Sequence, residues 1–323
     1  MVFTGFLLGL LLRFIGTFTT IYNFLLGDKL LFIGTNFTIL GLILDFKVPI
    51  QYNCIAKGSS MMNYDTKIAV TTERDYKVVK ANEIIQKARY NLNITELKIL
   101  AYILSKIKPA DTELQEYTFS IKDYCQVCGI DYKNGGNYEY IKLTLKGMRD
   151  KSFWIQDETG AETTVGWLGK VRINKGSGKV KVKLDEDMHK YVIGLFDNYT
   201  QYELLSTLPM KSAYSFRIYE LLKSYAFTKH HTFDIDDLKR LLAAENYINF
   251  KDFRKKVIEI AVKEINLYTD LEVSWEAIKK GRKVIQVKFS IVQRDTWGKY
   301  MAANRASAQI EGQISMLEYN YYK

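Results

Sequence analysis

Basic side chains gather in two short stretches of the second half of the chain, and their spacing suits contact with phosphate groups. In the first stretch, Lys251, Arg254 and Lys255 share one side of a predicted helix by their i, i+3, i+4 spacing. The second stretch surrounds one glycine and comprises Lys279, Lys280, Arg282 and Lys283. Arginine can bond guanine through two parallel hydrogen bonds, and lysine can hold phosphate. These residue types predict contact with nucleic acid, and a solvated surface is the alternative for either stretch taken alone.

A weaker basic set occupies the corresponding places in the first half. Lys142, Lys146 and Arg149 form a stripe on a predicted helix, and Lys175 and Lys179 accompany a glycine-rich turn. This set suits phosphate positioning, and packing between two copies of the chain is the competing use. Asn249, which begins the helix of the second half, completes the predicted DNA-contact residues.

The residue patterns that catalysis would need are missing from the sequence. A nicking enzyme needs a His-x-His metal pair, but His230 and His231 are adjacent and His189 is the only other histidine. A primase or polymerase site would need clustered carboxylates to bind metal ions. Asp234, Asp236 and Asp237 do cluster, but they open a predicted helix, where Asp is expected as a cap. No phosphate-binding glycine loop for ATP occurs. We therefore expect a protein that is not an enzyme and uses neither a cofactor nor a small-molecule substrate.

The cysteines favour a reducing compartment over a metal site. Cys125 and Cys128 form a C-x-x-C pair, but no second pair supplies the four ligands that zinc requires. With Cys54 there are three cysteines in 323 residues, too few for a disulfide framework. We expect no metal, buried thiols in a short helix and a cytoplasmic location.

The elements that would position the first basic set follow a recognisable order. The pattern predicts a short helical stretch, a helix capped by Thr95, a short strand, a helix capped by Ser120 and ended by Gly129, a third helix, and three strands. Their ranges are Asn82–Asn91, Glu96–Ile107, Tyr117–Phe119, Ser120–Val127, Tyr138–Asp150, Ser152–Asp157, Thr163–Ile173 and Lys179–Leu184. The turn 174–178 joins the last two strands.

The same order returns in the second half. The predicted ranges are helix Lys211–Ala226, strand His231–Phe233, helix Ile235–Ala243 after Asp234, helix Phe250–Tyr268 after Asn249, and the hairpin Leu271–Ile278 with Val284–Val292. Phe119–Tyr124 also aligns with Phe233–Leu238. Helix, strand, two helices and a hairpin predict an α+β fold, a tandem pair of winged-helix (helix-turn-helix plus β-hairpin) domains related by internal duplication. Two unrelated α+β domains are the alternative.

Bulk composition agrees with a protein of about two globular domains. The net charge is +10, which favours a polyanionic partner, either nucleic acid or an anionic membrane surface. We expect an N-terminal segment at 1–60, the first winged helix at 61–195, the second winged helix at 196–295 and a tail at 296–323.

Residues 1–60 differ from the rest of the chain because they are mostly apolar. Their uncharged runs, Val2–Leu12, Phe14–Gly27 and Leu30–Leu44, are shorter than the roughly 18 residues of a spanning helix. Our hypothesis is that they are upstream DNA translated in frame before the start at Met61 or Met62. A real membrane segment is the alternative, and the protein would then be a membrane-anchored DNA-binding regulator.

Three stretches of the second half carry a family resemblance: Tyr214–Tyr225 (YSFRIYELLKSY), Phe233–Leu242 (FDIDDLKRLL) and Phe253–Leu271 (FRKKVIEIAVKEINLYTDL). They resemble the iteron-binding plasmid replication initiators. Asn82–Leu104 and Leu143–Trp154 resemble the first domain of that family. The resemblance implies binding of double-stranded DNA at origin repeats, contact with a host helicase or initiator, and a homodimer in equilibrium with a monomer. It also implies that the dimer represses its own gene, that the first domain dimerises and that the second reads the repeats. A winged-helix transcriptional regulator is the runner-up.

Overall fold

The computed structural model describes residues 72–132, 135–156 and 159–312. The chain divides into two compact units, 1–59 and 60–323, and the described residues belong to the second. The hypothesis of upstream translation falls on residues outside the described ranges. Within those ranges, no helix combines the length and the apolar character needed to cross a membrane.

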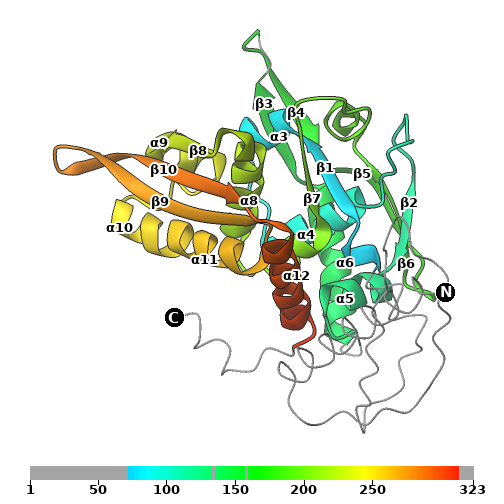
Figure 1. Cartoon of the computed structure of the whole chain (residues 1–323). Coiled ribbons are helices and arrows are strands. Elements are labelled where there is room, and N and C mark those ends of the chain that lie inside the picture. The colour runs from blue at the N-terminus through cyan, green and yellow to red at the C-terminus, as the bar shows by residue number, and fades with distance from the viewer. Residues whose placement is uncertain (1–71, 133–134, 157–158, 313–323) are drawn as a thin grey trace, which may run out of the picture. The chain divides into compact units, whose positions relative to one another are not determined.

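The first winged helix has the predicted order of helices and sheet strands, although one cap and one strand differ from the prediction. Its elements are α4 (Ile94–Leu104), β2 (Tyr117–Ser120), α5 (Ile121–Cys128), α6 (Gly135–Arg149), β5 (Leu168–Ile173) and β6 (Lys179–Leu184). The three strands form an antiparallel sheet in the order β2-β6-β5. This sheet and the helices that pack against it are shown in Figure 1.

The second winged helix repeats that arrangement. Its elements are α8 (Ala213–Ser224), β8 (His230–Asp234), α9 (Ile235–Leu241), α10 (Phe250–Phe253), α11 (Glu259–Tyr268), β9 (Leu271–Lys280) and β10 (Lys283–Gln293). The sheet order is β8-β10-β9, which corresponds to β2-β6-β5. The predicted α+β fold with tandem winged helices is therefore confirmed, and its origin by duplication stays a prediction.

Three of the predicted helix caps are confirmed. The Ser120 hydroxyl accepts the Asp123 N–H at 2.9 Å, and Gly129 ends α5 with a positive φ of 68°. Asn249 caps the helix of the second half through the Asp252 N–H at 2.8 Å. These contacts span three residues or fewer, so the local sequence is enough to specify them.

Two other predicted caps are wrong. Asn93, and not Thr95, caps α4, because it exchanges hydrogen bonds with Glu96 in a capping box. The Thr95 hydroxyl lies 3.2 Å from the Tyr140 hydroxyl instead. Asp234 occupies the residue before α9, but its carboxylate makes no cap bond and accepts from the side chain of Gln286 at 3.1 Å.

The predicted strand Thr163–Ile173 is two strands that belong to different sheets. β4 (Glu162–Gly166) pairs with β3 (Ser152–Gln156), whereas β5 pairs with β6. Trp167 lies between them, fully buried, with its ring 4.4 Å from that of Phe153. Burial of this large ring fixes the point where the chain passes from one sheet to the other.

Several elements were not predicted. They are β1 (Lys77–Ala81), which pairs with β7 (Tyr199–Glu203), together with α7 (His189–Val192), α12 (Thr296–Ile310) and the 3-10 turns Glu186–Met188, Leu204–Ser206 and Ala226–Thr228. The helical stretch predicted at Asn82–Asn91 is shorter, since α3 covers Asn82–Gln86. α12 buries Ala302, Ala306 and Ile310 and packs on α11.

Helix α8 carries a buried polar network. Lys80 Nζ of β1 lies 2.6 Å from Glu220 Oε1, and the Tyr202 hydroxyl donates to the same oxygen at 2.6 Å. Arg217 donates to the carbonyl oxygens of Ala88 and Leu241. The helix is thereby bonded to elements that precede and follow it in the sequence, which fixes the scaffold beneath the second winged helix.

Candidate nucleic-acid interface

The helix of the second half that would enter a DNA groove is held firmly on its inner side. Phe253, Val257 and Ala261 are fully buried, and Phe250 is partly buried with its ring 6.4 Å from that of Trp275. The predicted core face is therefore confirmed. With that face fixed in the core, the other side of the helix is turned toward solvent.

A π-helical segment, Arg254–Ile258, joins α10 to α11. Such a segment has hydrogen bonds from residue i to i+5, and it often occurs at functional sites. It brings Arg254 Nε to 3.2 Å from Glu259 Oε1, with the two side chains 39% and 46% exposed. From its spacing in the sequence, Arg254 was predicted to be a free cation beside Lys251 and Lys255. In the structure it forms an ion pair with Glu259.

The neighbouring lysines have no such partner. Lys251, Lys255 and Lys256 are exposed, and within the described part of the chain none of their side chains makes a hydrogen bond or an ion pair. Lys256 is not among the residues predicted from the sequence, although its place beside Lys255 could have suggested it. Three free cations therefore lie on the first turns of this helix, where the dipole disfavours positive charge unless an anion is near.

Both the oxygen and the nitrogen of the Asn249 side-chain amide take part in capping the helix. Its Oδ1 accepts the Asp252 N–H, and its Nδ2 donates to the Asp252 carboxylate at 2.8 Å. The side chain therefore positions the start of the helix, and its predicted contact with DNA stays untested.

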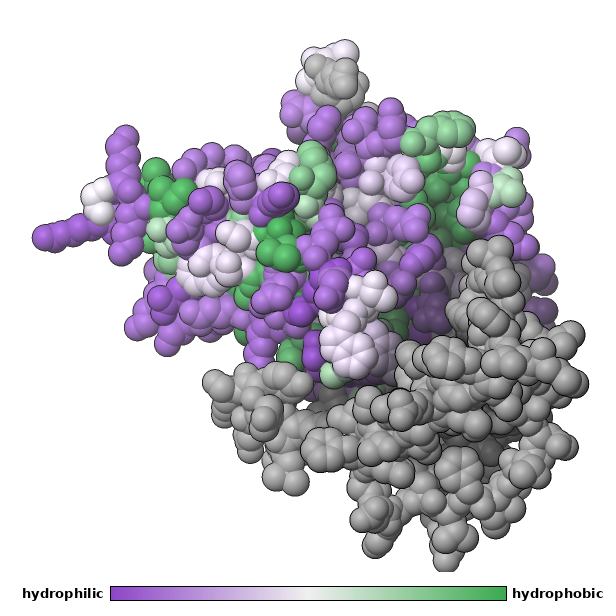
Figure 2. Space-filling model, viewed as in Figure 1, coloured by the Kyte–Doolittle hydropathy of each residue, from purple (hydrophilic) through white to green (hydrophobic). Residues whose placement is uncertain are grey.

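The hairpin of the second half ends in a basic tip, which we call the second wing (279–283). The strands run further than predicted, so Lys279, Lys280 and Lys283 lie on β9 and β10, and the turn contains Gly281 and Arg282. All four cations are exposed, and Gly281 adopts a φ of 64°. The hairpin extends beyond the start of α10 in Figure 1, and its end is hydrophilic in Figure 2.

The corresponding helix of the first half, α6, has its cations partly compensated. Ile141, Leu145 and Met148 are buried as predicted, and Tyr138 is partly buried. On the outer side, Lys142 Nζ lies 3.1 Å from Glu139, and Arg149 lies 3.8 Å from Asp150. Lys146 is exposed and has no partner among the described residues.

The hairpin of the first half forms the predicted turn. The Asn174 side chain accepts from the Gly176 N–H at 3.0 Å, and Gly178 has a φ of 63°. Lys175 lies in the turn, Lys179 begins β6, and both are exposed. The two halves thus present basic residues at the same two elements, with the larger uncompensated set in the second half.

The remaining polar candidates have structural roles. The His231 ring stacks on Tyr225 at 3.6 Å, and partial burial lowers the pKa of this histidine. Cys125 is buried as predicted, and desolvation raises the pKa of its thiol to about 11, whereas Cys128 is only partly buried. Across residues 72–132, 135–156 and 159–312, no three His, Cys, Asp or Glu side chains could hold a metal together.

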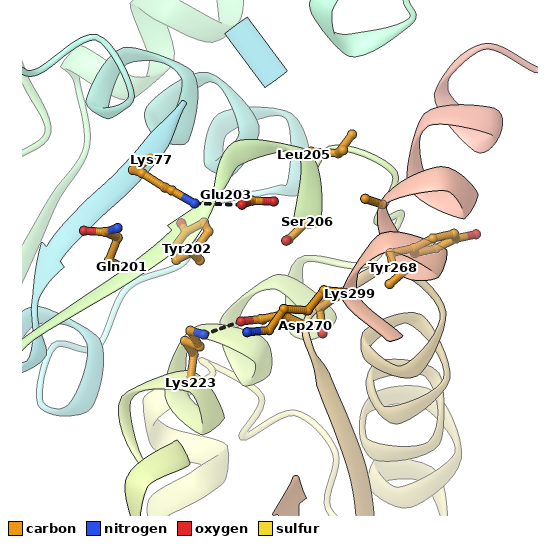
Figure 3. Close-up of a pocket in the computed structure, with 13 residues that line it drawn as sticks. Lys77, Gln201, Tyr202, Glu203, Leu205, Ser206, Lys223, Tyr268, Asp270 and Lys299 are labelled. Atoms are coloured by element: carbon orange, nitrogen blue, oxygen red, sulfur yellow. Dashed lines mark hydrogen bonds and ion pairs between the residues drawn. The ribbon is translucent and has the colours of Figure 1, made fainter. Parts of the chain in front are cut away.

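A cavity of about 230 Å³ lies among β7, α8 and α12. Two of its three lysines are paired, Lys77 with Glu203 at 2.7 Å and Lys223 with Asp270, and Figure 3 shows both pairs. Because its carboxylates balance most of the positive charge, the cavity lacks the surplus that a phosphate group would need.

The fold and the distribution of charge define a protein made of two winged-helix domains, each with a basic helix and a basic hairpin tip. Residues 77–223 match the family model described as "Initiator Replication protein, WH1". Residues 234–291 match the model described as "Initiator Rep protein, WH2". The two models together match more than half of the chain, which therefore belongs to the family of initiator replication proteins. The first match includes α8, and the predicted division at 195 stays a prediction.

Two further similarities agree with that membership. A "Replication initiation protein" from Escherichia coli is 24% identical over 225 residues, which are 66% of this chain and 69% of the relative. The crystal structure of the Pi initiator protein in complex with iteron DNA aligns with a TM-score of 0.58 at 18% identity. That alignment covers 69% of this chain and 99% of the other, and it shows a shared fold.

Proposed function

We propose that this initiator binds repeated duplex sequences, iterons, at a plasmid origin and thereby starts replication. One observation carries the proposal: within the described ranges, exposed cations without a partner cluster at the two elements with which a winged helix touches DNA. In the second half they are Lys251, Lys255, Lys256, Lys279, Lys280, Arg282 and Lys283. The solved Pi structure, which contains iteron DNA, supports the choice of ligand.

In the proposed complex, the helix beginning at Phe250 enters the major groove with its first turns toward the bases. Arg254 leaves Glu259 and bonds a guanine, while Lys251 and Lys255 hold phosphate groups. Asn249 keeps the helix start in place. The second wing lies on the backbone beside the groove, where its cations contribute affinity that does not depend on sequence.

The first winged helix contributes a weaker contact. Lys146 is the free cation of α6, and Lys142 and Arg149 must first leave their carboxylates. Lys175 and Lys179 extend the contact at the hairpin. We further propose that this domain dimerises, that the dimer represses its own gene, and that the monomer contacts host replication proteins in the cytoplasm. No catalytic step is part of the proposal.

Selection of bound duplexes from a random library tests this function. Two recognition helices on successive turns of one duplex should give a motif of about 20 base pairs. We expect that motif as direct repeats beside the gene, and we expect a plasmid with mutated repeats to stop replicating. Absence of any sequence preference would refute the proposal. A motif found once, at promoters but not at an origin, would assign the chain as a transcriptional regulator.

A further inference from the structure

The outer side of the β2-β6-β5 sheet is covered with positive charge. On β6, Val180, Val182 and Leu184 point into the core and are fully buried. The alternate residues point outward, together with those of β5. We call this surface the basic sheet face, and its members are Lys170, Arg172, Lys179, Lys181 and Lys183.

The strand register sets these cations opposite one another. Lys170 of β5 pairs with Lys183 of β6, and Arg172 pairs with Lys181. Directly opposite side chains in an antiparallel sheet have Cβ atoms about 4.5–5.5 Å apart, and like charges at that distance destabilise the sheet. Two cross-strand repulsions therefore persist in one small sheet.

Few carboxylates relieve this repulsion. Glu116 lies 3.2 Å from Lys181 and Glu186 lies 3.1 Å from Lys183, in ion pairs that are well exposed and contribute little. The side chains of Lys170, Arg172 and Lys179 make no hydrogen bond or ion pair with any described residue. The face thus keeps a surplus of positive charge that an external anion would neutralise.

The second winged helix shows that a three-stranded sheet of this architecture can fold without two like-charge pairs on its outer side. At the corresponding place on β9 and β10, Lys288 is opposite Glu276, with Nζ and Oε1 3.0 Å apart. Ser290 is opposite Ser274 on the same side. The like-charge pair of the second sheet, Lys280 opposite Lys283, lies at the hairpin tip. At the positions that match the basic sheet face, the second sheet has one opposite-charge pair where the first has two like-charge pairs.

We propose that the basic sheet face binds the phosphate backbone of duplex DNA and extends the contact made by the hairpin tip. The inference rests on the proposed function, because it deepens the grip on the same DNA. Lys179 connects the face to the tip residue Lys175, so the surface is continuous. Alternate residues of a strand repeat at about 7 Å, which gives a regular row of cations along β6.

Charge complementarity and composition select a duplex over a single strand. Proteins that hold single strands add aromatic side chains on which bases stack. The outward positions of the described strands β2, β5 and β6 hold lysine, arginine, glycine, threonine and serine, and no aromatic residue. Such a surface can bond phosphate oxygens and ignores the bases, so its contribution is independent of sequence.

The test replaces the two unpaired cations of β5 in the full chain, as Lys170→Glu with Arg172→Glu. Each glutamate is then opposite a lysine, so the melting temperature should stay or rise by about 1–4 °C. Binding to a duplex of about 40 base pairs that carries the selected motif, roughly four helical turns, should nevertheless weaken. The loss should be on the order of 10²-fold at 50 mM salt, and the slope of log K against log salt should flatten by about 1.8.

A matched variant controls for net charge. Lys87→Glu with Lys108→Glu changes two exposed lysines outside the proposed contact elements, and binding should change far less. Equal losses in the two variants would overturn the inference, as would a β5 variant that keeps the wild-type salt slope. Weakened binding to an oligonucleotide single strand or to anionic lipid vesicles, with duplex binding intact, would also overturn it.

The outcome is separable from that of the proposed function. Sequence preference is the ratio of affinities for the selected duplex and a scrambled duplex, and the β5 variant should leave this ratio unchanged. If the wild type shows no preference, the proposed function fails, but the salt slope still reports whether the face holds phosphate.

Discussion

Arg254 offers the sharpest test of how the second winged helix would read DNA. Its partner Glu259 lies 3.2 Å away, and both side chains are 39–46% exposed. An ion pair this exposed contributes at most about 1 kcal/mol to stability, so Arg254→Ala should leave the fold nearly unchanged. Loss of a two-bond contact with guanine should cost about 1–3 kcal/mol of binding, which is roughly a five- to 150-fold weaker Kd.

Two companion variants separate base reading from charge. Arg254→Lys keeps the positive charge but loses the planar pair of donors, so it should keep affinity for scrambled DNA and lose discrimination. Glu259→Gln frees Arg254 and removes a negative charge next to the DNA, so binding should tighten by up to about 1 kcal/mol. The part of this gain that comes from freeing Arg254 should vanish when Arg254 is already alanine, and only the smaller part from the lost negative charge should remain.

The assay is a titration of selected and scrambled duplexes, followed by gel shift or fluorescence anisotropy, with a melting curve for each variant. If Arg254→Ala discriminates between the two duplexes as well as the wild type, Arg254 does not read a base. If Glu259→Gln tightens binding equally in the alanine background, its effect is a general charge effect and the release of Arg254 is not part of binding.

The second wing, the buried ion pair and the end of α5 give three further predictions. Alanine at the four cations of the second wing should weaken binding to cognate and scrambled DNA alike and flatten the salt slope by about 0.9 for each lost phosphate contact; a folded variant with the wild-type slope would exclude the wing from the interface. Glu220→Gln should lower the free energy of unfolding by about 3–5 kcal/mol in urea titrations, since it leaves buried Lys80 uncompensated, whereas Lys77→Gln should cost at most about 1 kcal/mol because its pair with Glu203 is exposed. Gly129→Ala should lower the melting temperature more than Gly194→Ala: both residues have positive φ, but a Cβ at Gly129 would lie 2.2 Å from the Ile310 carbonyl oxygen, and one at Gly194 would meet nothing within 4 Å. Equal decreases in melting temperature for the two variants would mean that α12 moves away from the new Cβ without loss of stability.

The sequence determined the elements whose causes are local. Ser120, Gly129 and Asn249 act on backbone groups within four residues, so their caps were predictable from residue type and position. The spacing of Phe253, Val257 and Ala261 likewise predicted which side of the helix is buried. The order of elements followed from such signals, and with it the tandem winged-helix fold and the two basic elements of each domain.

Tertiary structure decided whatever depends on partners far along the chain. The split of Thr163–Ile173 depends on strands β3 and β6, and the strand β1 exists as a partner of β7. The π-helical segment that sets Arg254 beside Glu259 could not be read from helical spacing, because it departs from that spacing.

The charge of the basic sheet face also belongs to the tertiary structure. In the sequence, Lys170 and Lys183 are thirteen positions apart within an ordinary alternating pattern. The antiparallel register of β5 and β6 places them directly opposite each other. The alternation of residues along a strand predicts which face of the sheet each side chain lies on. Its neighbour across the sheet is set by strand pairing, and the pairing is decided by the core that both strands bury.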